Sequence, residues 1–552
     1  MKKMITVILA LVLILALAAP AFAADTTINI TGVSGRTFDA YQLMSASVDT
    51  AGGNYHYEVN AKYRSLLAKV INTQSGLALP DLTDASATDQ YILSYLEGLA
   101  TKAAQMRKLT DAIYRAIQAD GTLNPEATFT GNTTTLPQGY WLIVDVTDLS
   151  GMSGVSNSLV MVDTVGDEEV TISAKPDTPE MYKKIDDVND SNTSEDALAW
   201  RDSADHDIGD AIPYQITVEL PNNIETYVSY DFLLADHASK GLTYNPESFT
   251  ITVAGAPKTI AAAGETVGGV TPDFYYTIAT DTASGESFLK VYPSADVYDY
   301  DTKSWVDASS TQGGNVLAVG AQNNNTVIFS YTCTLNENAV IGAAGNPNWA
   351  DFEYSNNPYD KGHGKTPEDV CIAFTYKTTF NKVDGKGQPL SGADFELYKF
   401  VQDDSGSEIH DGDKGTWVLD DSKVIDATGT VFSFTGLDDG HYKLVETVTP
   451  AGYNGLPDEG LHFTVTADHV IQFDTYATNL LTSLNGKEEV SGTITLTSTL
   501  ATGELASTVV NNSGAELPST GGIGTTIFYI LGALMATGAG VVMVTRKRVG
   551  EE

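Results

Sequence analysis

Cysteine and basic residues are scarce in this chain of 552 residues. Its two cysteines, Cys333 and Cys371, are too few for a disulfide scaffold. Both lie in strand-like runs of the middle region, and the sequence leaves open whether they form one bridge or remain two small buried side chains. With 31 lysines and arginines against 71 aspartates and glutamates, the formal net charge is −40. This charge disfavours nucleic acid as a partner.

Patterns for metal binding, cofactor binding and hydrolysis are also missing. None of the eight histidines, His206, His237 and His363 among them, has metal-ligand spacing to a cysteine or a second histidine. We therefore expect solvated loop histidines and no metal site. The acidic run 186–192 lacks the glycine and distal glutamate of an EF-hand loop, and no nucleophile elbow occurs. The sequence predicts no cofactor and disfavours a surface enzyme.

Two long apolar runs lie near the ends of the chain. Two lysines precede the run 5–19, and small residues two apart follow it, which is typical of a signal peptide cleaved after Ala23. The second run, 523–544, is long enough to span a bilayer as a helix, and a basic cluster at 546–548 follows it. The sequence thus predicts an exported chain with a membrane segment near its C-terminus.

A pentapeptide directly before the second apolar run refines this prediction. It consists of Leu517, Pro518, Ser519, Thr520 and Gly521. Together with the apolar run and the basic tail, it resembles the cell-wall sorting signal of Gram-positive surface proteins. The resemblance implies that sortase, a membrane transpeptidase, cuts between Thr520 and Gly521 and joins the Thr520 carbonyl to an amine. It also implies a secreted chain anchored in the cell wall.

Short alternating strands dominate the rest of the chain. Strand patterns recur at 27–31, 37–43, 139–144, 158–162, 214–220, 248–253, 326–331, 395–398 and 441–445. Apolar residues at helical spacing predict one helical stretch over 89–118. We expect a mainly β chain of three tandem immunoglobulin-like β-sandwich domains, the first with a helical insertion. The predicted parts are a signal peptide (1–23), an N-terminal domain (24–175), a middle domain (176–377), a C-terminal domain (378–513) and the sorting signal (514–552).

The third domain carries the most informative pattern. It resembles the Cna B-type domains of Gram-positive surface proteins, through the segments 380–384, 389–398 and 442–453. The resemblance implies an intramolecular isopeptide bond, in which Lys382 on the first strand attacks the side-chain amide of Asn511 on the last strand. Glu446 takes the position of the assisting acid.

This chemistry requires burial. An amine attacks an amide only when it is neutral, and burial lowers the pKa of a lysine while raising that of a carboxyl group. A protonated Glu446 can then polarise the amide carbonyl and shuttle protons as ammonia leaves. The alternative for Lys382, Glu446 and Asn511 is that each is an ordinary exposed residue.

The middle domain shows a similar set of residue types. Its segments 179–185, 234–244 and 352–358 resemble the middle domain of sortase-assembled backbone pilins, which implies a lysine, an aspartate and an asparagine in that order. Strand alternation favours Lys183 as the nucleophile over Lys184, which should point outward.

The other two members of this set are less sharply defined. Asp236 is the predicted acid, with Asp231 as the alternative. Asn356 is preferred to Asn357, which precedes a proline and can shape the turn instead. We therefore expect a bond between Lys183 and Asn356.

The first domain shows no such set. No lysine lies between Asp25 and Gln42, so its opening strands cannot supply a nucleophile. Asp145 stands near the acid position of this fold. We predict no isopeptide bond in this domain.

The linker after the first domain contains a candidate for intermolecular linkage. Backbone pilins typically carry their linking lysine there, in a Tyr-Pro-Lys-Asn-like motif. Lys175 keeps this position, but Ser173-Ala174 replaces Tyr-Pro and Pro176 replaces Asn. The alternative is an ordinary exposed linker lysine.

These resemblances together imply a major pilin, the structural subunit of a covalently polymerised pilus shaft. The implied partners are sortase, other copies of the chain bound head to tail, minor pilins and peptidoglycan. The remaining alternative is a minor pilin or a monomeric wall-anchored adhesin that binds host protein or glycan.

Overall fold

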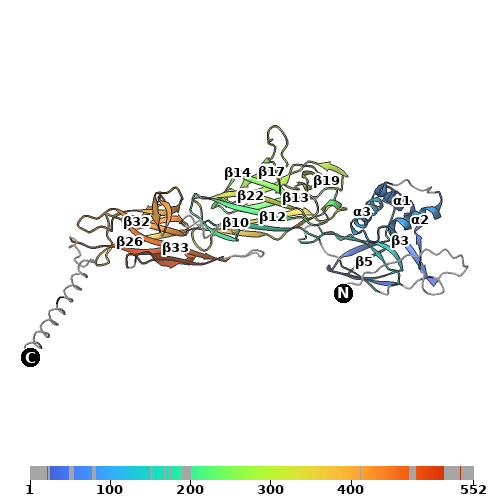
Figure 1. Cartoon of the computed structure of the whole chain (residues 1–552), viewed down its shortest axis with the longest axis horizontal. Helices are drawn as coiled ribbons and strands as arrows, with labels where there is room; N and C mark the ends of the chain where they lie inside the picture. Colours follow the sequence, from blue (N-terminus) through green and yellow to red (C-terminus); the bar gives the residue numbers. More distant parts are fainter. Residues whose placement is uncertain are drawn as a thin grey trace, which may run out of the picture.

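The chain forms three β-rich units in a row, and the computed structural model is elongated along this direction (Figure 1). The structure describes residues 21–22, 25–48, 55–76, 83–149, 152, 154–166, 169–173, 177–188, 191, 200–410, 412–470, 480–490, 492–514 and 535. The sequence-based expectation of a mainly β chain with three tandem β-sandwiches is confirmed. The predicted signal peptide, except for Ala21 and Phe22, lies outside the described residues.

The first unit combines two sheets with three helices. One sheet has the order β6-β2-β9 and the other contains β1, β3, β4, β5, β7 and β8. The strands are β1 (Ala21–Phe22), β2 (Thr26–Thr31), β3 (Thr37–Val48), β4 (Tyr55–Val59), β5 (Ala127–Thr130), β6 (Thr133–Leu136), β7 (Gly139–Asp145), β8 (Leu159–Asp163) and β9 (Glu169–Ser173). The helices between β4 and β5 are α1 (Ala61–Ser75), α2 (Ala85–Glu97) and α3 (Ala103–Asp120).

The helical insertion is larger than the stretch predicted over 89–118, and it is broken. The side chain of Asn60 caps α1 by accepting from the Lys62 amide, and Gly76 ends the helix in a left-handed conformation. Asp84 caps α2 in the same way. Gly98 ends α2, so the predicted single helix is two helices.

The middle unit is a sandwich of a five-stranded sheet, β10-β12-β22-β14-β15, and a nine-stranded sheet, which has the path β11-β25-β23-β13-β18-β17-β16 with β21 and β24 at its side. The first sheet contains β10 (Glu180–Ile185), β12 (Ala211–Glu219), β14 (Leu242–Val253), β15 (Ala256–Lys258) and β22 (Thr326–Leu335). The second contains β11 (Ser203–Asp205), β13 (Asp231–Ala238), β16 (Ile260–Ala262), β17 (Phe274–Thr280), β18 (Ser287–Pro293), β21 (Gly314–Asn315), β23 (Asn346–Ser355), β24 (His363–Lys365) and β25 (Asp369–Phe374). A small hairpin, β19 (Val297–Asp299) and β20 (Ser304–Val306), and two 3₁₀ turns, η1 (Ile224–Thr226) and η2 (Val316–Val319), complete it.

The third unit pairs its first and last strands. The sheet β30-β31-β26-β36-β35 packs on the sheet β28-β29-β27-β32-β33-β34, and β26 runs parallel to β36. The strands are β26 (Tyr376–Asp384), β27 (Asp394–Gln402), β28 (Glu408–His410), β29 (Asp413–Asp420), β30 (Val424–Ile425), β31 (Val431–Leu437), β32 (Gly440–Val448), β33 (Leu461–His469), β34 (Leu481–Glu488), β35 (Thr497–Thr499) and β36 (Glu504–Asn511), with a 3₁₀ turn η3 (Leu500–Thr502).

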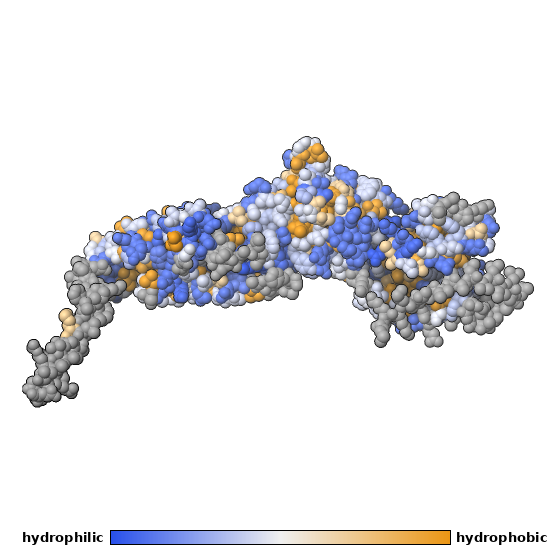
Figure 2. All heavy atoms as spheres, in the orientation of Figure 1, coloured by the Kyte–Doolittle hydropathy of each residue, from blue (hydrophilic) through white to orange (hydrophobic). Residues whose placement is uncertain are grey.

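Strand alternation explains how each sandwich forms its core. Along β22, every second residue from Val327 to Leu335 is buried, and Phe329 faces the same interior as Ile216 on the neighbouring strand. Such a period of two places one apolar face against the opposite sheet and leaves the other face polar. Figure 2 shows the result: the visible surface is mostly hydrophilic, with hydrophobic residues gathered at the tip of a loop that projects near β17.

The middle and third units share a buried polar joint. The Lys399 Nζ atom lies 2.6 Å from Asp207 Oδ2 and 3.0 Å from Asp438 Oδ2. The Asp438 amide donates to Asp207 Oδ1 at 2.9 Å. Burial raises the pKa of the Asp438 carboxyl well above its usual value, while the Lys399 charge opposes this shift. One lysine of the third unit therefore holds carboxylates from both units.

Among the described residues, no helix is both long and apolar enough to cross a membrane. The predicted membrane segment 523–544, except for Met535, lies outside them.

We expect Lys399→Met to lower the stability of the protein through this joint. This change keeps the volume of the side chain but leaves Asp207 and Asp438 without their buried cation, so we expect the free energy of unfolding at pH 7 to fall by about 3 kcal/mol. Because an unpaired buried carboxyl takes up a proton more readily when folded than when unfolded, the loss should shrink at pH 5. Urea unfolding at both pH values measures it.

Lys423→Met is the matched control. Lys423 pairs with Asp394, but both side chains are partly exposed, at 27% and 38%, so its loss should cost under about 1 kcal/mol. Equal effects of the two substitutions would contradict a special role for the joint.

Candidate functional site

The third unit brings together all three residues that the sequence singles out there. Because β26 and β36 are parallel neighbours, Lys382 stands opposite Val509 and Asp384 opposite Asn511. Lys382 and Asn511 are both buried. The side-chain amide of Asn511 donates to Glu446 Oε1 at 2.7 Å, and Glu446 comes from β32 of the opposite sheet.

The surroundings of Lys382 favour its neutral form. Burial lowers the pKa of its amine, although the nearby Glu446 charge acts in the opposite direction. Its Nζ atom donates only to backbone oxygens among the contacts described, to Val383 at 3.1 Å and Val509 at 3.4 Å. The Asn511 Oδ1 atom is buried without a hydrogen-bond partner in the described part of the chain. This carbonyl is therefore free to accept a proton donor.

The middle unit has a second buried lysine. Lys183 on β10 shares its inward face with Met181 and Ile185, as alternation predicts, and its side chain is fully buried. Its Nζ atom contacts the Asp236 carboxylate and lies 2.5 Å from the Tyr331 hydroxyl. The lysine and the aspartate come from opposite sheets.

Tyrosines surround this lysine and its aspartate. Tyr244 donates to Asp236 Oδ1 at 2.5 Å, and Tyr331 donates to Asp236 Oδ2 at 2.8 Å. Burial raises the pKa of both phenols well above its usual value, so both hydroxyls remain protonated donors. The Lys183 Nζ atom also lies 5.2 Å from the ring centroids of Tyr214 and Tyr331. Sequence reasoning did not identify any of these tyrosines.

The asparagine next to Lys183 is Asn348, and the prediction of Asn356 is wrong in this respect. Asn348 on β23 is fully buried, and its amide donates to the Tyr331 hydroxyl at 3.0 Å, the same hydroxyl that Lys183 contacts. On the neighbouring strand, Ala238 faces Asn348 and Asp236 faces Ala350. The lysine, the acid and Asn348 therefore converge on one point of the core.

Asn356 belongs to a different contact. It lies eight residues beyond Asn348, about 26 Å along an extended chain. Its side-chain amide donates to the Leu149 backbone carbonyl at 3.1 Å. Its backbone carbonyl accepts from the Asn157 backbone amide at 2.8 Å. These are contacts with the first unit. The strand continues too far before Asn356 for that side chain to reach Lys183.

The residues that the sequence offers as alternatives for the bond in the middle unit make other contacts. Lys184 points away from the core, with its Nζ atom 2.5 Å from Asp202 Oδ1. Asp231 lies 3.0 Å from the His363 ring, and Asn357 accepts from the Tyr359 amide at 3.0 Å.

The first unit buries an arginine beside Asp145, the aspartate that the sequence places near the acid position of this fold. Arg36 lies 3.0 Å from Asp145, and both side chains are buried. Burial raises the pKa of Asp145, although hydrogen bonds from Thr147 and the Arg36 charge oppose the shift. Because an arginine guanidinium stays protonated in proteins, it cannot act as a neutral amine. Like the clusters around Lys183 and Lys382, this pair combines a basic group with a carboxyl group, but it contains no amine that can act as a nucleophile.

The residues predicted to link one subunit to the next, Lys175 and the sorting motif 517–521, lie outside the described residues. The described chain ends β9 at Ser173 and resumes at Asp177, whose amide donates to Ser156 at 3.2 Å. In the sequence, Lys175 is the second residue after this last strand of the first unit.

The two cysteines are free, buried thiols. Cys333 lies on β22 and Cys371 on β25, in opposite sheets. Of the two alternatives that the sequence leaves open, the structure therefore shows two small buried side chains and no bridge.

The expectation of solvated loop histidines is wrong for His206 and His237, whereas His363 is exposed. His206 is buried against the Asp186 carbonyl at 3.0 Å, and His237 stacks on Phe288 with ring centroids 4.1 Å apart. His363 pairs with Asp231. Aromatic packing and carboxylate partners, which single-sequence spacing does not reveal, hold these rings in place.

Known proteins resemble the chain in the same regions. Residues 376–479 match the SpaA family, described as a prealbumin-like fold domain, and residues 509–549 match the LPXTG cell wall anchor motif. The trypsin-resistant surface T6 protein of Streptococcus pyogenes serotype M6 is 27% identical over 438 residues, which cover 68% of this chain and 70% of that protein. The chain is thus similar to the sortase-assembled major pilins of Gram-positive bacteria. Its anchor motif supports a location in the cell wall.

Two solved pilin structures are similar at lower identity. The T6 backbone pilin of serotype M6 Streptococcus pyogenes is 19% identical, with 90% of this chain and 100% of that chain covered and a TM-score of 0.49. The full-length major pilin SpaD from Corynebacterium diphtheriae is 15% identical, with 90% and 99% covered and a TM-score of 0.41.

The free cysteines predict a simple result with a thiol reagent. Because burial raises the pKa of both thiols well above its usual value, the native pilin should not react with Ellman's reagent. Both cysteines should react after unfolding in guanidinium without any reductant. If the unfolded chain reacts only after reduction, the two residues form a bridge.

Proposed function

We propose that sortase joins Thr520 of one pilin subunit to Lys175 of the next, and that two internal isopeptide bonds strengthen each subunit of the shaft. The observation that carries this proposal is the pair of buried lysines, Lys183 and Lys382, each beside a carboxyl group and a side-chain amide. Burial of an uncompensated ammonium group is costly, so this arrangement is favourable only if the amine reacts or is paired.

In the third unit, the proposed bond joins Lys382 to Asn511. The neutral Nζ atom attacks Cγ of Asn511, a C–N bond forms, the bond to the amide nitrogen breaks and ammonia leaves. Glu446 already accepts from the Asn511 amide, so it is positioned to pass a proton to the leaving nitrogen. Its other oxygen accepts from the Leu456 amide at 2.9 Å, which fixes the carboxyl group.

In the middle unit, the proposed bond joins Lys183 to Asn348, with Asp236 as the acid. The Tyr331 hydroxyl contacts both the lysine amine and the Asn348 amide, so it holds the two reacting groups on either side of one oxygen. The Asn348 carbonyl oxygen is buried without a partner among the described residues, so it is available to accept a hydrogen bond during the reaction. The tyrosines orient Asp236 for this role.

The two bonds would act differently under tension. Lys382 and Asn511 lie in adjacent parallel strands at the start and end of the third unit, so their bond ties the entry strand to the exit strand. Lys183 and Asn348 lie in opposite sheets, so their bond ties the two layers together. On the chain-entropy model for cross-links, closing loops of this length stabilises each unit by ~4 to 5 kcal/mol.

The mass of the chain tests the internal bonds. The recombinant chain of residues 24–516 should weigh roughly 17 Da less per bond than its sequence mass, because each bond releases one ammonia. Asn348→Ala should abolish the mass deficit from the bond in the middle unit, and Glu446→Ala should abolish the deficit from the bond in the third unit.

Asn356→Ala is the matched control, because it removes an asparagine near the end of the same strand and should keep both losses. A loss that survives Asn348→Ala but disappears in Asn356→Ala would overturn the assignment made here. A chain without any mass deficit would reject both bonds.

The intermolecular linkage predicts a polymer ladder. Wall extracts of cells that express the pilin and its sortase should contain very high-mass species on denaturing gels, and Lys175→Ala should reduce them to monomer. Lys184→Ala, which removes another lysine close to the linker, should leave the ladder unchanged. Ladders that persist in Lys175→Ala would place the linking amine elsewhere.

A further inference from the structure

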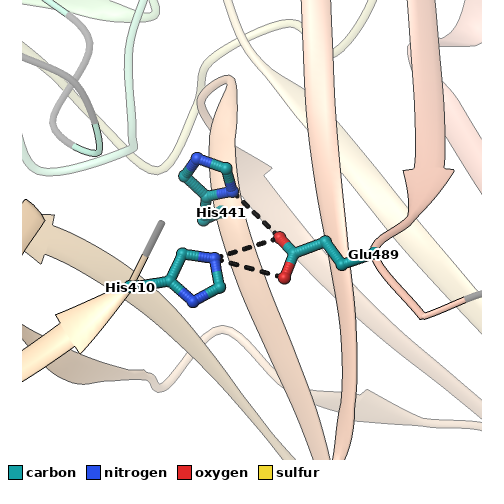
Figure 3. Close-up of side chains that lie close together, drawn as sticks. All are labelled: His410, His441 and Glu489. Atoms are coloured by element: carbon teal, nitrogen blue, oxygen red, sulfur yellow. Dashed lines mark hydrogen bonds and ion pairs between the residues drawn. The ribbon is translucent and has the colours of Figure 1, made fainter. Parts of the chain in front are cut away.

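Three histidines and one glutamate gather on one face of the third unit, away from the isopeptide cluster. His410 ends β28, His441 lies on β32, His462 lies on β33, and Glu489 directly follows β34. Figure 3 shows that the rings of His410 and His441 both point toward the Glu489 carboxylate. These residues are up to 79 positions apart in the chain, so only the fold brings them together.

The donor atoms are spaced like ligands of one small cation. His441 Nδ1 lies 2.9 Å from Glu489 Oε1, and His410 Nε2 lies 3.2 Å from either Glu489 oxygen. One donor atom from each of the three residues lies within 4.8 Å of the others. Ligands around a tetrahedral zinc ion with bonds of 2.0–2.1 Å are separated by about 3.3 Å. The observed spacing fits this geometry after small side-chain rotations.

His462 is the nearest further donor. Its Nδ1 atom lies 3.8 Å from Glu489 Oε2, while its Nε2 atom lies 3.1 Å from the Glu459 carbonyl. A backbone carbonyl at Nε2 favours the tautomer with the proton there, which leaves the Nδ1 lone pair directed toward the cluster.

Neighbouring groups hold the four side chains in place. The Thr464 hydroxyl donates to Glu489 Oε1 at 3.1 Å. The His410 ring packs against both Phe400 and Trp417, with centroids 5.3 and 5.1 Å away. All four side chains of the cluster are largely buried, with 12–21% of their surface exposed. Such support fixes ligand geometry and limits competition from water.

We propose that His410, His441 and Glu489, with His462 beside them, bind one divalent d-block cation of the zinc type. Imidazole and carboxylate together suit Zn²⁺ rather than Ca²⁺ or Mg²⁺, which prefer oxygen ligands only. The cation would tie the β28–β29 hairpin to β32 and β33 and so reinforce the exposed sheet of the third unit. The competing description is a set of histidine–carboxylate ion pairs without a metal.

Zinc chloride titrated into the recombinant chain of residues 24–516, purified without a histidine tag, tests the site. Calorimetry should show saturable binding of one ion per chain. Co²⁺ in place of Zn²⁺ should give the visible absorption of a four-coordinate site with nitrogen ligands. His410→Gln, His441→Gln and Glu489→Gln should each weaken zinc binding by at least about tenfold.

His363→Gln is the matched control, since this ring also pairs with a carboxylate, Asp231, but in the middle unit. It should bind zinc as the wild type does. Circular dichroism separates loss of ligands from loss of folding, and Glu489→Gln keeps the shape of the side chain if a histidine variant unfolds. No saturable binding by the wild type, or equal binding by the three site variants and the wild type, would overturn the proposal.

Discussion

The arrangement of the middle and third units depends on one constraint, a lysine side chain buried between two β-sheets. An ammonium group in an apolar core is expensive unless a carboxylate pairs with it or it loses its proton. Lys183 and Lys382 lie in such cores, each next to an acid and an amide that are themselves buried or half-buried. The same burial that makes these positions costly also lowers the pKa of Lys382, which prepares the amine for attack.

The three units differ in the basic side chain that lies beside the carboxyl group. The middle and third units present a lysine, whereas the first presents Arg36 against Asp145. Both residues neutralise a buried carboxylate, but only a lysine can become a neutral nucleophile. Further along the chain, Lys399 uses the same charge pairing at the joint between the middle and third units.

Covalent and non-covalent links alternate along the axis of the molecule. The proposed internal bonds lie inside the middle and third units, the buried Lys399 pairs lie between them, and Asn356 contacts the first unit through Leu149 and Asn157. Lys175 and Thr520 stand in the sequence just beyond the last strand of the first unit and the last strand of the third. If the proposed linkages form, a subunit built in this way would pass tension from one to the next mainly through its strands.

Local patterns and short recognisable motifs were enough to predict the sorting motif, the alternating strands, the inward position of Lys183 and the set of Lys382, Glu446 and Asn511. They were not enough to choose Asn348 over Asn356 as the neighbour of Lys183. The two asparagines lie an even number of residues apart, so alternation gives both the same face, and the register of β23 against β13 selects between them. The broken helix, the free thiols and the cluster of His410, His441, His462 and Glu489 were likewise beyond local pattern. The physical reason is common to all: packing between strands far apart in the chain sets which side chains meet.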